Sequence, residues 1–250
     1  MGHISRKGSL SKVQNVRERV RIFKDWHKVM FPLNRVYKGV QKLHLRNGAS
    51  AYVRDVRSMD VNIVRDVLGK DEYAVATWLR VPENAIVFDL GANIGTFCIA
   101  VYNLCPTVHI TAYEPHPGNF KMLKMNASFA TLIQKAATEK TGTVHLEDNT
   151  NSVGLQVVKQ GGISVEASSL DDILKDVEKV DLLKIDIEGS EYGLLDAASS
   201  QTFSKVQKII METHNVSGFD DLEWAETILT KNGFKITWID PLGVIYGERL

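Results

Sequence analysis

The chain has 250 residues, of which 44% are hydrophobic and 24% are charged, with a formal net charge of zero. These values are typical of a folded globular protein and exclude disordered and collagen-like chains. No stretch approaches the roughly 18 apolar residues of a membrane span, and the first residues lack the apolar core of a secretory signal, so we expect a cytoplasmic protein without a membrane span.

The charge is unevenly distributed along the chain. Residues 1–50 contain twelve Lys or Arg and two acidic residues, a net charge of +10, which leaves −10 on the remaining 200 residues. Within this basic segment, apolar residues at spacings of three and four predict an amphipathic helix over residues 11–31. We expect its apolar stripe to pack on the body of the protein or on a second subunit of a homodimer. Contact with an anionic membrane surface or with nucleic acid is the alternative.

The next residues lead into a larger unit. A turn signal at residues 47–48 predicts a hairpin over residues 42–54, and residues 58–80 have a helical pattern. We interpret residues 1–80 as a basic extension of helices and a hairpin, which serves as a cap or contacts substrate or a second subunit. Residues 81–250 form the main domain in this interpretation.

From residue 85 onward, predicted strands and helices alternate. Strands are expected at residues 85–91, 109–115, 131–138, 180–187 and 206–212, followed by a terminal hairpin of residues 234–239 and 244–246. This order predicts an α/β fold with a mostly parallel, doubly wound sheet. In such sheets ligands bind beyond the carboxyl ends of the strands, so polar residues at these ends are candidates for a site.

The first two strands of the main domain end in residues suited to a nucleoside. The first leads into a glycine loop with Gly91 and Gly95, where the backbone can approach a ligand closely. The second ends at Glu114, 19 residues beyond Gly95, where a carboxylate would bind both hydroxyls of a ribose. Asn93 replaces a glycine of the dinucleotide-binding pattern and Asp89 adds negative charge, which disfavours a pyrophosphate and therefore a nicotinamide or flavin cofactor. A ligand with an ammonium and a sulfonium group, S-adenosylmethionine, is favoured instead.

Six segments of the sequence resemble the FkbM family of S-adenosylmethionine-dependent methyltransferases: residues 87–97, 113–117, 135–137, 169–174, 180–191 and 210–214. The most specific is the Lys-Ile-Asp-Ile-Glu-Gly-Ser-Glu run that begins at Lys184. The resemblance implies a Rossmann-like class I methyltransferase fold, with a seven-stranded sheet whose last strand is antiparallel. It also implies transfer of a methyl group, usually to a hydroxyl oxygen of a glycan or another small molecule. The basic extension has no counterpart in these motifs.

The glycine loop and the resemblance together predict the residues that bind the cofactor. They are Asp89, Gly91, Ala92, Asn93, Gly95, Thr96, Phe97, Glu114, Pro115, Ala137 and Asp186.

A cluster of acid and base side chains follows the fourth and fifth strands. Lys184 and Asp186 alternate onto one face of the fourth strand, and Glu212 and His214 do the same on the fifth. If these strands are neighbours, as the resemblance implies, the four side chains form a catalytic cluster beside the sulfonium. Methyl transfer to a hydroxyl needs alignment and a base for the proton. His214 is our first candidate base and Asp186 the second.

Three alternatives stay open. Asp186, Glu188, Glu212 and His214 could hold a divalent cation instead, although no spacing is diagnostic of metal ligands and we favour a site without metal. The basic extension could serve an RNA methyltransferase, but it lacks interleaved aromatic residues and an RNA-binding motif, so nucleic acid is disfavoured. The third alternative is a non-catalytic nucleoside-binding protein.

Overall fold

The computed structural model describes residues 12–30, 38–76, 78–147, 157–158, 161–214, 221–239 and 243–250. The N-terminal extension contains α1 (Lys12–Ile22), α2 (Trp26–Met30), β1 (Gln41–His44), β2 (Ser50–Val53), α3 (Asp60–Ile63) and the π-helical segment η1 (Val64–Gly69). Strands β1 and β2 pair antiparallel, which confirms the predicted hairpin.

The rest of the chain alternates between strands and helices. Its first part contains β3 (Ile86–Leu90), α4 (Thr96–Leu104), β4 (His109–Tyr113), α5 (Pro117–Asn126), β5 (Thr131–Ile133), β6 (Ala136–Ala137), β7 (Gly142–Leu146), β8 (Val157–Val158) and β9 (Ile163–Ser168). Its second part contains α6 (Leu170–Ile173), β10 (Leu182–Ile185), α7 (Glu191–Ala197), α8 (Ser200–Ser204), β11 (Lys208–Glu212), α9 (Asp221–Lys231), β12 (Phe234–Ile239) and β13 (Val244–Arg249).

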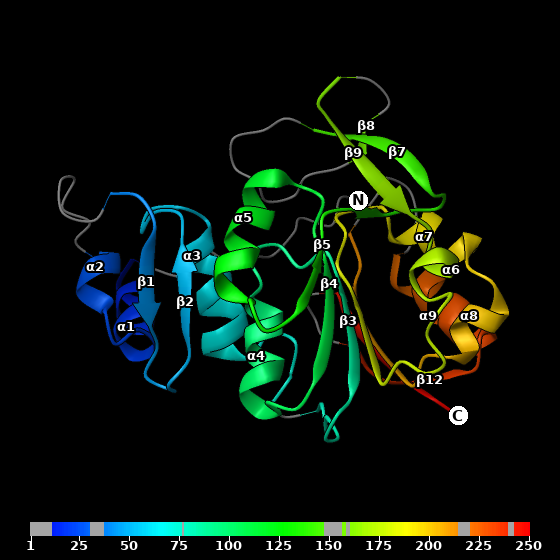
Figure 1. Cartoon of the computed structure of the whole chain (residues 1–250). Coiled ribbons are helices and arrows are strands. Elements are labelled where there is room, and N and C mark those ends of the chain that lie inside the picture. Colours follow the sequence, from blue (N-terminus) through cyan, green and yellow to red (C-terminus); the bar gives the residue numbers. More distant parts are fainter. Residues whose placement is uncertain are drawn as a thin grey trace, which may run out of the picture.

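Within the described ranges, the central sheet has seven strands in the order β12-β13-β11-β10-β3-β4-β5. The pairs from β11 through β5 are parallel, and β13 runs antiparallel to both β11 and β12. Helices α4 and α5 lie on one face, with the extension beside them, and α6 to α9 lie on the other (Figure 1). The arrangement confirms the predicted α/β, mostly parallel, class I methyltransferase fold with an antiparallel last strand.

A second, smaller sheet lies over the carboxyl ends of the central strands (Figure 1). It has the order β6-β9-β7-β8 among the described residues. The single strand predicted over residues 131–138 is therefore wrong in extent: β5 belongs to the central sheet, whereas β6 pairs with β9. The chain passes from the central sheet to the smaller sheet at residues 134–135, between β5 and β6.

The extension shares a hydrophobic core with one face of the central sheet. Phe23, Leu43 and Val64 of the extension belong to the same buried cluster as Val87 of β3 and Leu123 of α5. Full burial of one such side chain stabilises a fold by about 2–3 kcal/mol. A separate cluster fills the space between the other face and helices α6 to α9. The extension is therefore packed as part of the molecule's main core.

Two helical predictions in the extension are too long. The helix predicted over residues 11–31 is divided into α1 and α2, because Phe23 between them forms a β-bridge with Leu45. The helix predicted over residues 58–80 ends at Gly69, and left-handed backbone at Asp71 and Ala74 then turns the chain inward. None of the helices in the described part of the chain is long and apolar enough to cross a bilayer.

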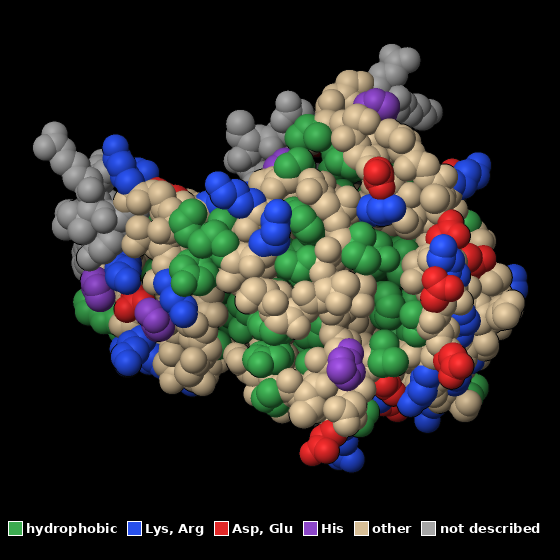
Figure 2. Space-filling model, viewed as in Figure 1, with side chains coloured by type: hydrophobic (Ala, Val, Ile, Leu, Met, Phe, Trp, Pro, Cys, Tyr) green, Lys and Arg blue, Asp and Glu red, His purple; other side chains and the backbone are tan. Residues whose placement is uncertain are grey.

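The uneven charge of the sequence is visible on the surface. Figure 2 shows Lys, Arg and His side chains gathered over the extension, whereas acidic and basic side chains mix at the opposite end of this face. Nothing in the fold identifies a partner for the basic surface, so the expectations for a second subunit, a membrane or nucleic acid stay predictions.

Candidate active site

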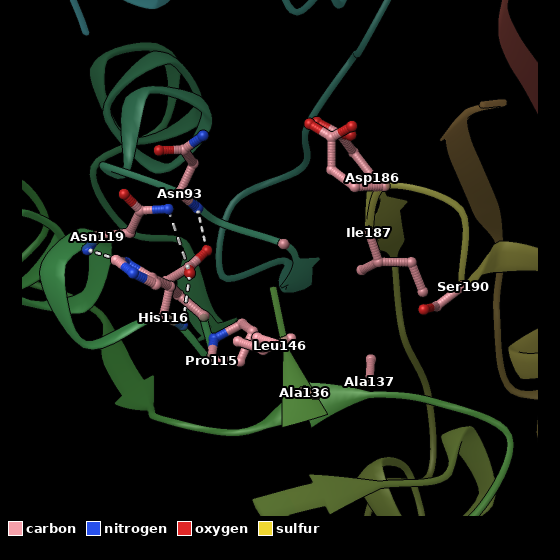
Figure 3. A pocket seen from close by; sticks show the side chains of 13 residues that line it. Asn93, Pro115, His116, Asn119, Ala136, Ala137, Leu146, Asp186, Ile187 and Ser190 are labelled. Carbon is pink, nitrogen blue, oxygen red and sulfur yellow. Dashed lines mark hydrogen bonds between the residues drawn. The ribbon is translucent and has the colours of Figure 1, made fainter. Parts of the chain in front are cut away.

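A pocket opens between the carboxyl ends of the central strands and the smaller sheet. Its empty space is about 610 Å³ when the open mouth is included. It is lined by Gly91, Asn93, Glu114, Pro115, His116, Asn119, Ala136, Ala137, Leu146, Asp186, Ile187, Glu188 and Ser190. In Figure 3, Asn93, His116 and Asn119 form one side, Asp186, Ile187 and Ser190 form the other, and Ala136, Ala137 and Leu146 lie between them. Six of the eleven predicted cofactor residues line this pocket.

Gly91 ends β3 at the point where the pocket begins. Its backbone has a φ of +80°, and a Cβ at this position would lie 1.8 Å from the carbonyl oxygen of Asp186. The Gly91 N–H donates to the carbonyl of Tyr113 at 3.0 Å. The Nζ of Lys184 donates to the Gly91 carbonyl at 2.8 Å. Only glycine allows the ends of β3 and β10 to approach so closely, which brings the loop against Asp186.

Glu114 is a buried carboxylate held from two sides. Its Oε2 accepts the Asn93 N–H at 2.9 Å, and its Oε1 accepts the His116 N–H at 2.8 Å. The side chain of Asn119 donates to Oε1 at 3.4 Å. Burial raises the pKa of Glu114 to about 7, although these hydrogen bonds oppose the rise. The carboxylate is therefore fixed in one orientation at the pocket wall.

Asn93 offers a hydrogen-bond acceptor that the protein leaves unused. Its Oδ1 is buried and has no hydrogen-bond partner among the described residues. Its backbone is left-handed, with a φ of +50°. A buried acceptor without a partner costs about 1–3 kcal/mol, so a ligand that brings donors, such as an amine or hydroxyls, suits this wall. The residues present fit an adenosine with an amino-acid tail.

Asp89 and Lys184 lie behind the glycine loop. They are register neighbours on β3 and β10, and their side chains form an ion pair of 3.1 Å that is almost completely buried. Asp89 also accepts from the Cys98 thiol at 3.3 Å. Neither residue is among those that line the pocket, so the expected contact of Asp89 with cofactor and the catalytic role of Lys184 stay predictions. Lys184 supports the loop from behind through its hydrogen bond to the Gly91 carbonyl.

Four other predicted cofactor residues also lie outside the pocket lining. Ala92, Thr96 and Phe97 are buried. Gly95 has a φ of +88°, and a Cβ there would meet the Leu123 side chain at 2.8 Å. The glycine therefore serves the packing of α4 on α5. These positions shape the loop from within and were not distinguishable by sequence from residues that face a ligand.

Beside the pocket, four carboxylates surround His214. Its Nδ1 lies 3.0 Å from the Glu191 carboxylate, and its Nε2 lies 3.2 Å from Glu188. Asp186 and Glu212 are each 3.8 Å from Nε2. The residues come from the end of β10, the start of α7 and the end of β11, so the predicted meeting of Asp186, Glu212 and His214 is seen in the structure.

The electrostatics of this cluster change the roles expected for its members. Burial disfavours the charged imidazole, but the hydrogen bond to Glu191 and the charges of Asp186, Glu191 and Glu188 outweigh it and raise the pKa of His214 to about 10. Burial raises the pKa of Asp186, yet Lys184, His214 and a tyrosine hydroxyl together hold it below its ordinary value. At neutral pH, His214 is therefore a cation and Asp186 a carboxylate.

The pKa of Glu212 is shifted in the opposite direction from that of Asp186, because burial of its carboxyl outweighs the favourable charges around it. Burial and the neighbouring charge of Asp186 raise the pKa of Glu212 above its ordinary value. Glu191 has a structural part: its carboxylate accepts the Ile187 N–H at 3.0 Å and the Gly189 N–H at 2.8 Å. These bonds hold the loop between β10 and α7, and Ser190 at the start of α7 makes no side-chain cap bond.

The cluster also contains the atoms of a candidate metal site. One ligand atom each from Asp186, Glu191 and His214 lie within 4.8 Å of one another. Glu191 and His214 already bond to each other, and the Glu191 carboxylate accepts two backbone N–H groups. The same geometry is that of an imidazolium between carboxylates, so a divalent metal ion at this place stays an alternative.

Several pocket residues were missed by the sequence argument. Asn119 was not among the predicted site residues. His116 caps α5 by accepting the Asn119 N–H at 3.4 Å, and the Asn119 side chain contacts Glu114. Leu146 and Ala136 reach the pocket from the smaller sheet. Leu146 could be identified only from its position in the fold, because it belongs to no strand of the central sheet, whereas Ala136 adjoins the predicted Ala137.

The sequence matches the methyltransferase FkbM domain over residues 89–236, which is more than half of the chain. It is 24% identical over 239 residues to "Methyltransferase 1" of Beauveria bassiana, covering 81% of this chain and 94% of that protein. It is 23% identical over 219 residues to 31-O-demethyl-FK506 methyltransferase FkbM of Streptomyces tacrolimicus, covering 72% and 84%.

Solved structures show more distant similarity. Magnesium protoporphyrin IX methyltransferase from Synechocystis, a structure with bound S-adenosylmethionine, aligns with a TM-score of 0.47 and 12% identity over 78% of this chain and 83% of that chain. The family match covers the glycine loop, Glu114 and the His214 cluster. The chain therefore belongs to the FkbM family of S-adenosylmethionine-dependent methyltransferases.

Proposed function

We propose that this protein transfers a methyl group from S-adenosylmethionine to a hydroxyl oxygen of a small molecule or a glycan. The observation that supports the proposal is the pocket, whose lining includes Gly91 of the glycine loop, Glu114 and Asp186. In this proposal Glu114 holds the ribose and Asp186 accepts the proton of the reacting hydroxyl. The name of one relative, a 31-O-demethyl-FK506 methyltransferase, supports oxygen as the acceptor atom.

The cofactor would be held by residues that line the pocket. Glu114 would accept hydrogen bonds from the two ribose hydroxyls, and the unused Oδ1 of Asn93 would accept from a donor group of the ligand. Ala137 and Leu146 give the neighbouring wall an apolar surface suited to adenine. When bound, the cofactor supplies an electrophilic methyl group on sulfur.

Asp186 is the base in this proposal, ahead of His214. A group that accepts a proton must be unprotonated at working pH, and His214 is held as a cation by its carboxylate neighbours. Asp186 lines the pocket and remains ionised, because Lys184 and His214 stabilise its charge. His214 then stabilises the arrangement of Asp186, Glu188 and Glu191 as their shared counter-ion.

Calorimetry with S-adenosylhomocysteine tests the cofactor site. The wild type should bind, and Glu114→Ala should bind at least about tenfold more weakly, because hydrogen bonds to a charged acceptor contribute about 1.5–3 kcal/mol. Exposed Glu83→Ala is the matched control and should bind like the wild type. A folded wild type that does not bind would discard the proposal.

A methyl-labelled cofactor with a panel of hydroxylated acceptors tests the reaction. Once an acceptor is found, Asp186→Asn should lower turnover by about 10²-fold or more, the usual contribution of general base catalysis. The Kd for S-adenosylhomocysteine should change by less than about threefold, because the amide keeps the shape of the side chain. Unchanged turnover would remove Asp186 as the base.

A further inference from the structure

A tyrosine from the N-terminal extension reaches into the acid cluster. Tyr73 lies in the turn after η1, outside the residues 89–236 that match the family. Its side chain is buried, and its hydroxyl donates to Asp186 Oδ2 at 2.7 Å. The same hydroxyl lies 3.3 Å from Glu212 Oε2. The extension thus contacts the carboxylate to which we assign the proton transfer.

The ring of Tyr73 is held on more than one side. It packs edge to face on Phe97, with ring centroids 5.6 Å apart and an interplanar angle of 89°. The Nζ of Lys184 lies 5.5 Å from the ring centroid, within the range of a cation–π contact. The next residue, Ala74, is buried and has a left-handed backbone with a φ of +48°. The hydroxyl therefore has little freedom to leave Asp186.

We propose that Tyr73 is a positioning residue, whose hydroxyl fixes the Asp186 carboxylate in its reactive orientation, so that the extension forms part of the active site. The inference rests on the proposed function. Methyl transfer is an alignment problem, and a base displaced by a fraction of an ångström loses much of its effect. A hydrogen bond from a rigid phenol provides this alignment without adding a charge.

The other groups that face Asp186 make longer contacts with it than Tyr73 does. Lys184 lies 3.4 Å away but also binds Asp89 and the Gly91 carbonyl, and His214 lies 3.8 Å from the other carboxylate oxygen. Glu212 does not hold Asp186 directly: its Oε2 lies 3.3 Å from the same Tyr73 hydroxyl, as a second acceptor. Burial and the charges of Asp186 and Glu212 raise the pKa of Tyr73 well above its ordinary value, so the phenol stays protonated and remains a donor.

Tyr73→Phe removes the hydroxyl and retains the ring. Tyr102→Phe is the matched control, because Tyr102 stacks on Phe129 and its hydroxyl makes no hydrogen bond to the described residues. With an acceptor in hand, Tyr73→Phe should lower kcat by about tenfold or more while the KM of the acceptor changes less than about threefold. Tyr102→Phe should leave both constants unchanged.

A second measurement needs no acceptor. Sinefungin carries an amine in place of the sulfonium, so its affinity relative to neutral S-adenosylhomocysteine reports the orientation of a nearby carboxylate. Tyr73→Phe should reduce this preference for sinefungin about threefold or more while binding S-adenosylhomocysteine like the wild type. Failure of the wild type to bind either compound would reject the proposed function. Wild-type binding with an unchanged preference and unchanged kcat in Tyr73→Phe would reject the role of Tyr73 alone.

Discussion

Arg54, at the end of the hairpin, donates from Nη1 to the side-chain oxygen of Asn119 at 3.0 Å. Asn119 in turn donates to Glu114 at 3.4 Å. Arg54 is itself fixed by an ion pair with the fully buried Asp60. The extension therefore supports the carboxylate assigned to the ribose as well as Asp186 on the other side of the pocket.

This relationship predicts the effect of Asn119→Ala. The substitution removes the donor to Glu114 but leaves the Arg54–Asp60 pair intact, so the fold should persist. Affinity for S-adenosylhomocysteine at pH 7 should fall about threefold or more, because Glu114 loses a donor that orients its carboxylate and stabilises its ionised form. Calorimetry measures the change, and Asn103→Ala, exposed on α4, is the control. Equal affinity in both variants would show that Asn119 does not orient Glu114.

The pKa of Glu114 predicts how cofactor affinity depends on pH. The carboxylate accepts two hydroxyl donors only when it is ionised, and its pKa is about 7. Affinity for S-adenosylhomocysteine should therefore decrease as the pH falls through 7, by up to about tenfold per pH unit below it. Calorimetry at pH 6 and pH 8 tests this. Glu114→Gln should bind weakly at both values, and a wild-type affinity independent of pH would contradict the assignment.

Gly91 lies so close to the Asp186 carbonyl that Gly91→Ala should greatly lower the free energy of unfolding. Its added Cβ would overlap the Asp186 carbonyl, so the loop or β10 must move. Gly48→Ala is a matched control, because Gly48 has a similar φ of +94° and open space around it. Urea unfolding should show a cost of about 1–2 kcal/mol for the control, from backbone strain alone, and at least about 2 kcal/mol more for Gly91→Ala. Equal costs would mean that the two strands can separate freely.

His214 predicts a pH-dependent contribution to stability. Its pKa is raised to about 10 in the folded protein, so its stabilisation is complete below the unfolded value of about 6.5 and is lost as the pH rises through 10. His214→Gln should lower the free energy of unfolding by several kcal/mol at pH 6, and the deficit should shrink by roughly 1.4 kcal/mol per pH unit between these values. Urea unfolding at pH 6 and pH 9 measures both.

Exposed His109 on β4 provides the control for this measurement. His109→Gln should change the free energy of unfolding little at either pH. A deficit of His214→Gln that is the same at pH 6 and pH 9 would show that the imidazole is not held as a cation by its four carboxylates.

Most of the central sheet could be predicted from the sequence, because the local residue pattern of its strands agrees with their packing in the fold. The run that ends at Gly91 is almost entirely apolar, as a central parallel strand requires, and the strand that ends at Glu114 buries Ile110, Ala112 and Tyr113. The helix predictions in the extension failed for the opposite reason. Phe23 leaves the helical path to pair with Leu45, and this tertiary contact has no trace in the helical periodicity.

The site could be predicted only in part. Glu114 and Asp186 follow strands of the central sheet, so the rule for strand ends finds them. Asp89 satisfies the same rule, but its side chain turns beneath the loop toward Lys184, which depends on cross-strand register. Tyr73 is 113 residues from Asp186 in the chain, and no spacing connects them. Residues that reach the site through tertiary packing require the structure.

The common core of the extension and the α4–α5 face has a consequence for engineering this enzyme. Phe23, Leu43 and Val64 interlock with Val87 and Leu123, so replacement of the extension by that of a relative would leave unfilled space in the interior. A chimaera of this kind is expected to be unstable before its selectivity can be measured. Redesign of acceptor choice is therefore better attempted by point substitutions of residues that line the pocket than by segment exchange.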